Sequence, residues 1–489
     1  MPPSPPHLRA RWGSWREGRM LRPVLTLVTG SAAAQAIVFA AQPVLTRLFL
    51  PEAFGVLTVV TTSVAVLSTV ASGGYRAAIL LPQDDDDRAH LLALTLAVAF
   101  GSTALTLLGV ALVVGAGLVE GAAALGLWWL APALVLTEAA AAAETWHTGR
   151  GRFRAVSWAR VAQSVVAVGV RLGVGLTVAQ ASDWSAGGLV GGAVAGLAAG
   201  ALVSVGWMVA ADGAAWASLR VARIRRLARR YVRFPSFSAP AALLNVASTR
   251  VPVFALVAFY GEAVVGQFGL AYGTLALPLG LVGGAVGQAF FPEASAARHD
   301  GRLGALTRAT ARGLWAVTAY PALAAAAAGP TLFAFVFGPE WVEAGQFAQR
   351  IAPWILLASV APPLTAVFDV LERQRDELSI SVLMFVVQTV VMVGAGLALD
   401  APEAVLAAGV TGTVLRAVHL AWIFRAAGVP LAGALGDSLG ALVRAAPFAA
   451  AVFAADRLGA GGAGVFAVAV VAGLAASAWA ARAYRRADA

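Results

Sequence analysis

The sequence predicts an all-α membrane protein that crosses the bilayer about fourteen times. Of its 489 residues, 60% are hydrophobic and only 12% are charged, whereas soluble domains have about 45–50% and about 25%. Mean hydropathy is +0.79, and apolar blocks of the length of a membrane-spanning helix recur along the chain. A soluble fold of this composition would lack polar surface. These values exclude a soluble enzyme, a disordered chain and a nucleic-acid binder.

The apolar blocks define the predicted spans in chain order. They lie at 24–46, 54–78, 91–114, 123–143, 158–180, 187–210, 237–259, 266–290, 313–337, 350–371, 378–399, 403–424, 438–455 and 463–481.

The positions of the basic residues predict the orientation of these spans. All 35 basic residues are Arg. If the N-terminus is inside, most of them, including Arg312 and Arg444, fall in inside loops and tails. The outside loops then hold only Arg47, Arg350 and Arg457, and three further arginines lie within spans. This asymmetry follows the positive-inside rule, so both termini are predicted to be cytoplasmic.

Several kinds of chemistry have no support in the sequence. There is no Cys, so thiolate nucleophiles and Cys-ligated metals are excluded. No GxxxxGK[ST] motif is present, and no loop is long enough for a soluble catalytic or nucleotide-binding domain. We therefore expect no cofactor, no metal and no enzymatic activity.

Two charged runs lie in predicted cytoplasmic loops. In Arg220–Arg233 most arginines share one side of a helix and apolar residues share the other, which predicts an amphipathic helix lying on an anionic inner leaflet. The acidic run Asp84–Asp87 lacks the spacing of a calcium loop and is interpreted as a solvated loop.

A weak repeat divides the chain. Gln42-Pro43-Val44 and Pro51–Gly55 correspond to Val251-Pro252-Val253 and Gly261–Gly266, with offsets of 209 for the prolines and 211 for the glycines. The predicted parts are a tail at 1–23, a six-helix bundle at 24–210, a basic linker at 211–236, a second six-helix bundle at 237–424, and two further helices with a short tail at 425–489. Such repeats are common in transporters, with the substrate site near the midplane.

Four segments resemble a known family. They are Thr46–Gly55, Tyr75–Pro82, Phe234–Ala241 and Phe337–Gly345. In this order they are similar to the polysaccharide-transporter branch of the multidrug/oligosaccharidyl-lipid/polysaccharide (MOP) flippase superfamily, which includes O-antigen and exopolysaccharide flippases. The resemblance implies two six-helix bundles around a central cavity. It also implies movement of undecaprenyl-pyrophosphate-linked glycans across the bacterial inner membrane.

A lipid-linked glycan needs a polar, cationic path with its lipid tail outside. Three arginines at bilayer depth fit this need, because each costs roughly 2.5–3.5 kcal/mol on insertion scales unless it meets water, a carboxylate or an anionic ligand. The alternative for each is a buried ion pair, such as Glu138 with Arg171. Polar side chains within spans are the other predicted substrate contacts, and a few titratable groups are candidates for ion pairing or for coupling to a proton or sodium ion. The substrate-contact set is Arg171, Arg250, Arg416, Gln35, Gln42, Asn245 and Gln288; the coupling or ion-pair set is Glu138, Asp369 and His419.

Other functions remain open at this point. A cation-coupled multidrug exporter should carry more intramembrane acids than bases, which is not the case here. A peptidoglycan lipid-precursor flippase of the same superfamily would also have a cationic cavity. A membrane-embedded polysaccharide polymerase or ligase would need a larger outside loop. The expected partners are a lipid-linked glycan and the bilayer, without nucleic acid, and the oligomeric state, monomer included, is left open.

Overall fold

The computed structural model describes residues 21–487 apart from 83, 120, 178–184 and 217–218. Most of the predicted tail at 1–23 lies outside this part. The described residues form helices and connecting turns without strands, which confirms the predicted all-α class. Helices are expected because hydrocarbon offers no hydrogen-bond partner, so each spanning segment must satisfy its own backbone.

The described residues divide into two compact units. The first comprises Met1–Phe49 and Val60–Leu243, and the second comprises Leu50–Val59 and Leu244–Ala489. Helix α3 contributes its first residues to the second unit and the rest to the first. The boundaries predicted for the two bundles, the linker and the C-terminal addition stay predictions.

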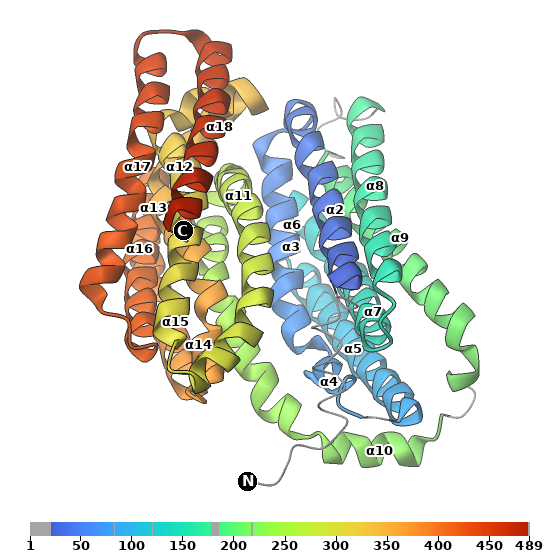
Figure 1. The fold of residues 1–489 in the computed structure, drawn as a ribbon. Helices are drawn as coiled ribbons and strands as arrows, with labels where there is room; N and C mark the ends of the chain where they lie inside the picture. The colour runs from blue at the N-terminus through green and yellow to red at the C-terminus, as the bar shows by residue number, and fades with distance from the viewer. Residues whose placement is uncertain (1–20, 83, 120, 178–184, 217–218, 488–489) are drawn as a thin grey trace. The chain divides into compact units, whose positions relative to one another are not determined.

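The first unit contains the helices up to the basic run (Figure 1). They are α2 (Leu21–Leu48), most of α3 (Pro51–Ala71), α4 (Tyr75–Ala78), α5 (Asp85–Gly115), α6 (Gly121–Trp128), α7 (Leu130–Gly149), α8 (Phe153–Thr177), α9 (Ser185–Trp216), α10 (Val221–Arg230) and the π-turn η1 (Phe234–Ser238).

The second unit contains the remaining helices, among them the two longest of the described chain (Figure 1). They are α11 (Ala239–His299), α12 (Leu303–Phe337), the 3₁₀ turn η2 (Pro339–Trp341), α13 (Val342–Leu364), α14 (Ala366–Val370), α15 (Gln374–Ala398), α16 (Ala401–Ala426), α17 (Leu431–Arg457) and α18 (Gly461–Ala487).

The number of crossings agrees with the hydropathy pattern. Twelve stretches of the described chain are long and apolar enough to span a membrane. Helix α2, with 28 residues, is a further helix long enough to cross the membrane. The 61-residue helix α11 is interrupted at Gly261, where φ is 82°. At 1.5 Å per residue α11 measures about 90 Å, which is enough for two crossings. Together these give the predicted fourteen.

Helices α8 and α9 pack closely through a row of glycines. Gly188, Gly192, Gly196 and Gly200 face α8 at four-residue spacing. A Cβ at Gly196 would lie 2.5 Å from the carbonyl oxygen of Gln163. Small residues at this spacing let helix backbones approach, which is the usual basis of helix association in membranes.

The two segments of the internal repeat contact each other reciprocally within the second unit. A Cβ at Gly55 would lie 1.9 Å from the carbonyl oxygen of Glu262, and one at Gly266 would lie 1.8 Å from that of Pro51. Since Glu262 and Gly266 correspond to Pro51 and Gly55 at an offset of 211, each contact is the image of the other. The start of α3 and the part of α11 after Gly261 therefore meet as a local two-fold pair.

The four segments that carry the family resemblance also meet in pairs. In the first unit, the Tyr75 hydroxyl donates to the Ala228 carbonyl at 3.3 Å, and α4 contacts η1. In the second unit, the rings of Phe54 and Trp341 pack edge to face at 5.0 Å. These segments therefore contribute to the packing between neighbouring helices within each unit.

The basic run forms α10, but its apolar face does not lie on lipid as predicted. Leu227 is 1% exposed and packs with Ile79, Leu91 and Leu92 of the first unit, with Ile224 beside it. Around Leu227 the apolar face of α10 is thus covered by the apolar surface of α4 and α5, whereas Val221 at the start of the helix is 66% exposed.

We expect Gly266→Ala to disrupt the contact between α3 and α11, because its methyl group would overlap the Pro51 carbonyl. Overpacking of this kind costs about 1–3 kcal/mol or more. The matched control is Gly273→Ala, where nothing lies within 4 Å of the added Cβ. Thermal unfolding in detergent should show a clear drop in Tm for Gly266→Ala alone; equal Tm values for the two variants would contradict the packing.

Candidate functional site

The three arginines predicted at bilayer depth lie within helices, and none forms an ion pair with a described carboxylate. Arg171 of α8 donates its Nε–H to the Leu189 carbonyl of α9 at 3.1 Å. The Arg250 Nε in α11 is buried without a hydrogen-bond partner among the described residues. Arg171 belongs to the first unit and Arg250 and Arg416 to the second, so their convergence on one hollow stays a prediction.

Glu138 does not pair with Arg171. It is 1% exposed, and its carboxylate lies 3.5 Å from an Nη atom of Arg76 in α4. The other acid of α7, Glu144, forms an ion pair with Arg160 of α8 at an Nη–Oε distance of 3.0 Å. Arg160 also donates a hydrogen bond to the Ser31 hydroxyl at 2.7 Å. The acids of α7 are therefore neutralised by arginines nearer the helix ends, and Arg171 keeps an uncompensated charge.

Arg416 belongs to a polar chain that links α16 to α15. Its Nη1 lies 3.2 Å from Nδ1 of His419, and Nε2 of His419 lies 3.4 Å from the Glu377 carboxylate. Because a guanidinium only donates, Nδ1 of His419 must accept, and Nε2 carries the proton toward Glu377. His419 is 2% exposed and stacks on Phe368, with ring planes at 9°.

The remaining predicted polar residues have different surroundings. Gln35 and Gln42 of α2 are half-buried, whereas Asn245 and Gln288 of α11 are exposed. Asp369 of α14 is also exposed, although it is within electrostatic range of Glu377.

A cavity of about 410 Å³ lies between α11 and α13 in the second unit. Its wall is glycine-rich on α11, from Gly280 to Gly287, and includes Ser359 and Pro363 on α13. Tyr272 lines the same cavity and lies within electrostatic range of Arg416. None of the predicted substrate contacts is among the described residues that line this cavity, and Arg416 is related to it only through Tyr272.

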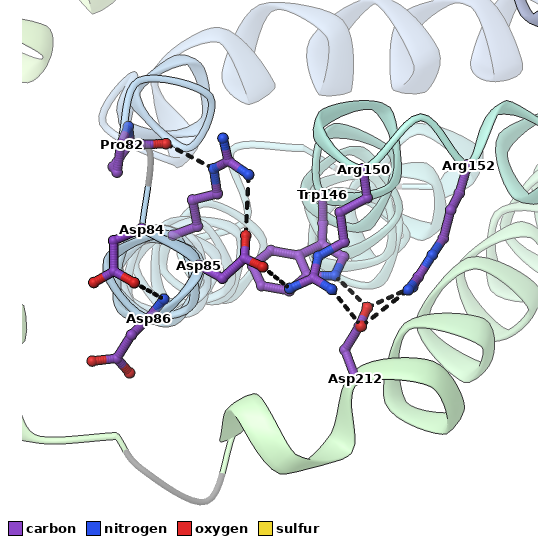
Figure 2. A network of polar contacts seen from close by, with 9 residues as sticks. Pro82, Asp84, Asp85, Asp86, Trp146, Arg150, Arg152 and Asp212 are labelled. Atoms are coloured by element: carbon purple, nitrogen blue, oxygen red, sulfur yellow. Dashed lines mark hydrogen bonds and ion pairs between the residues drawn. The ribbon is translucent and has the colours of Figure 1, made fainter.

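A network of ion pairs at one end of the first unit was not predicted from the sequence (Figure 2). Asp212 of α9 is bound by Arg150 at 2.7 Å, by Arg152 at 2.6 Å and by the Trp146 indole N–H at 2.9 Å. Arg150 also reaches Asp85 at 3.0 Å. The network joins α5, α7 and α9.

The acidic run belongs to the same end of the unit and is not a solvated loop. Asp84 caps α5 by accepting from the Asp86 amide at 3.1 Å, and the next three aspartates form the first turn, where negative charge is stabilised by the helix dipole. Arg223 of α10 binds Asp84 at 2.7 Å and Asp87 at 2.6 Å, and it also pairs with Asp86. The acidic and basic runs thus hold α10 on α5.

Metal binding has no support in the described residues, where no three His, Asp or Glu side chains are grouped to hold an ion. The described site residues are fixed guanidinium groups and the polar chain of Arg416, His419 and Glu377.

A model of the family described as "Polysaccharide biosynthesis protein" matches residues 44–346. The chain belongs to this family. No significant match is found among curated proteins.

Solved structures of membrane transporters share the fold of this family member. One titled "Lipid II flippase MurJ, inward closed conformation" superposes with a TM-score of 0.72 at 10% identity, over 95% of this chain and 99% of that one. An inward-facing multidrug resistance MATE family transporter of the MOP superfamily gives a TM-score of 0.57 at 12% identity, over 82% and 94%. The family match bears out the predicted resemblance to a polysaccharide family, and these structures show that the fold is shared with such transporters.

We expect Arg223→Ala to loosen α10, because one side chain holds several carboxylates. A nitroxide on Ala228→Cys would report this, since the chain has no other Cys and Ala228 packs against the first unit. Nitroxide mobility should rise with Arg223→Ala and stay low with Arg226→Ala, an exposed arginine with no described ion pair. Equal mobility in both variants would contradict a specific clamp.

The same nitroxide should respond to acid. The hydrogen bond from the Asp86 amide, followed by the charge of Arg223, lowers the pKa of Asp84. A carboxyl whose pKa is lowered by folding stabilises the folded form above its unfolded pKa of about 3.9, and this contribution is lost as pH falls through the lower folded value. We therefore expect α10 to stay docked at neutral pH and to loosen only in strong acid. Release near pH 6 would contradict this assignment.

Proposed function

We propose that this protein moves undecaprenyl-pyrophosphate-linked oligosaccharide or polysaccharide precursors across the bacterial inner membrane by alternating access. The observation that carries the proposal is the polysaccharide biosynthesis family match on a chain whose fold follows a flippase over 95% of its length. The inner membrane, cytoplasmic termini and a lipid-linked glycan as partner belong to the same proposal.

The charge pattern within the helices supports an anionic substrate. Arg171, Arg250 and Arg416 have no described carboxylate partner, while the buried acid Glu138 is already paired. An unpaired arginine at bilayer depth is unfavourable, and a pyrophosphate would supply the missing negative charge. A cationic-drug exporter would need the opposite excess.

Arg416 is the best-supported headgroup contact. It is within electrostatic range of Tyr272, which lines the cavity of about 410 Å³, and the glycine-rich wall of that cavity leaves room for a bulky polar group. Binding a phosphate would exchange the weak donor contact with His419 for charge-assisted hydrogen bonds, which are roughly twice as strong as neutral ones.

A second candidate is flipping of a peptidoglycan lipid precursor. It is favoured by the TM-score of 0.72 to the structure titled as a Lipid II flippase. Both substrates present a lipid-linked pyrophosphate, so the cationic site serves either. Complementation of a strain depleted of its lipid-precursor flippase, compared with complementation of a polymer-export mutant, would separate the two.

We expect Arg416→Gln to reduce export of the polymer at least tenfold at normal protein levels. The reason is the loss of a charge-assisted contact of about 1.5–3 kcal/mol. Arg425→Gln, nine residues further along α16 and exposed, is the matched control. Unchanged export by a normally inserted Arg416→Gln protein would remove Arg416 from the substrate path.

A further inference from the structure

A second cavity, separate from the one beside Tyr272, lies between α12, α17 and α18. Its volume is about 310 Å³. The side chains that matter here are Arg312 and Tyr320 of α12, Asp437, Arg444 and Phe448 of α17, and Trp479 of α18. All of them belong to the second unit.

One end of this cavity has an excess of positive charge. The Asp437 carboxylate lies 2.5 Å from Nε of Arg308 and 3.2 Å from Nε of Arg312. Two guanidinium groups therefore share this carboxylate. Arg444 lines the cavity and pairs with no described carboxylate. The three arginines and one aspartate leave a local excess of two positive charges.

The other end is apolar. The rings of Phe448 and Trp479 lie 6.5 Å apart, and the wall between them and the arginines is largely alanine. Tyr320 directs its hydroxyl to the Ala469 carbonyl, so it presents its ring to the cavity. A ligand that fits must combine an anionic group with a hydrocarbon chain.

The surroundings of the cavity are those of a lipid-facing surface. Val443 and Leu474, next to it on α17 and α18, are 70% and 69% exposed. The Arg444 guanidinium is directed back along α17 toward the start of the helix, since a Cβ at Gly440 would lie 3.2 Å from Nη1 of Arg444. An arginine that extends in this way brings its charge toward the headgroup region, where lipid phosphates lie.

We propose that this cavity binds an anionic phospholipid of the surrounding leaflet. Its phosphate lies between Arg312 and Arg444, and one acyl chain follows Phe448 and Trp479. The lipid neutralises the arginine excess and connects α17 and α18 to α12. This inference does not depend on the transported substrate.

The test uses the full chain in nanodiscs of phosphatidylcholine with or without phosphatidylglycerol. Native mass spectrometry should show phosphatidylglycerol retained by the wild type and retained at least tenfold less by Arg444→Gln, with Arg425→Gln unchanged. Ala445→Phe, which fills the cavity without altering charge, should also lose the lipid. Phosphatidylglycerol, but not phosphatidylcholine, should raise the Tm of the wild type, which tests the site even where a variant folds poorly.

Three results would overturn the proposal. The first is equal retention of phosphatidylglycerol by the wild type and Arg444→Gln. The second is equal retention of the neutral and anionic lipids by the wild type. The third is displacement of phosphatidylglycerol by equimolar farnesyl pyrophosphate, which would assign the cavity to a prenyl-pyrophosphate substrate instead. Failure of any kind here leaves the effect of Arg416→Gln on export untouched, so the two proposals are separately testable.

Discussion

Polar groups inside a bilayer must be satisfied by the protein itself, because acyl chains neither donate nor accept hydrogen bonds. In this chain the backbone meets that requirement by forming helices throughout the described residues. The charged side chains meet it unevenly. Glu138 and Glu144 have arginine partners, whereas among the described residues Arg171 has only a backbone carbonyl and Arg416 only a histidine nitrogen. For these two side chains the imbalance is an excess of guanidinium, so what they lack among the described residues is negative charge.

The helices approach each other closely where side chains are absent. The glycine row of α9 against α8 and the contact of Gly55 and Gly266 with opposing carbonyls both bring backbones together. Charged clamps then act at the helix ends, where water is available and where Arg223 holds the start of α5. Glycine packing therefore joins helices within the bilayer, and ion pairs join them at the helix ends, where water is present.

The class of fold and the number of crossings could be predicted because they depend on local hydropathy and length. The contact between Arg416 and His419 could also be predicted, since the two residues are three positions apart on the same helix face. The partner of Glu138 was not, because Arg76 lies 62 positions earlier and sequence spacing does not reveal which helices are neighbours. For the same reason the sequence does not reveal that Arg223 pairs with the acidic run from 139 positions away. Arg312, Arg350 and Arg444 were placed in loops, whereas α12, α13 and α17 extend over them.

The two-fold contact has a consequence for how a duplicated sequence can evolve. Thr58 and position 269 are equivalent at the offset of 211, and they face each other across the local axis, where a Cβ at Gly269 would lie 2.4 Å from the Thr58 hydroxyl. Two threonines would collide there, and two glycines would leave an unfilled gap. Identical residues at these two positions therefore could not pack in this way, and the pair of one threonine and one glycine is the asymmetric solution that this chain carries.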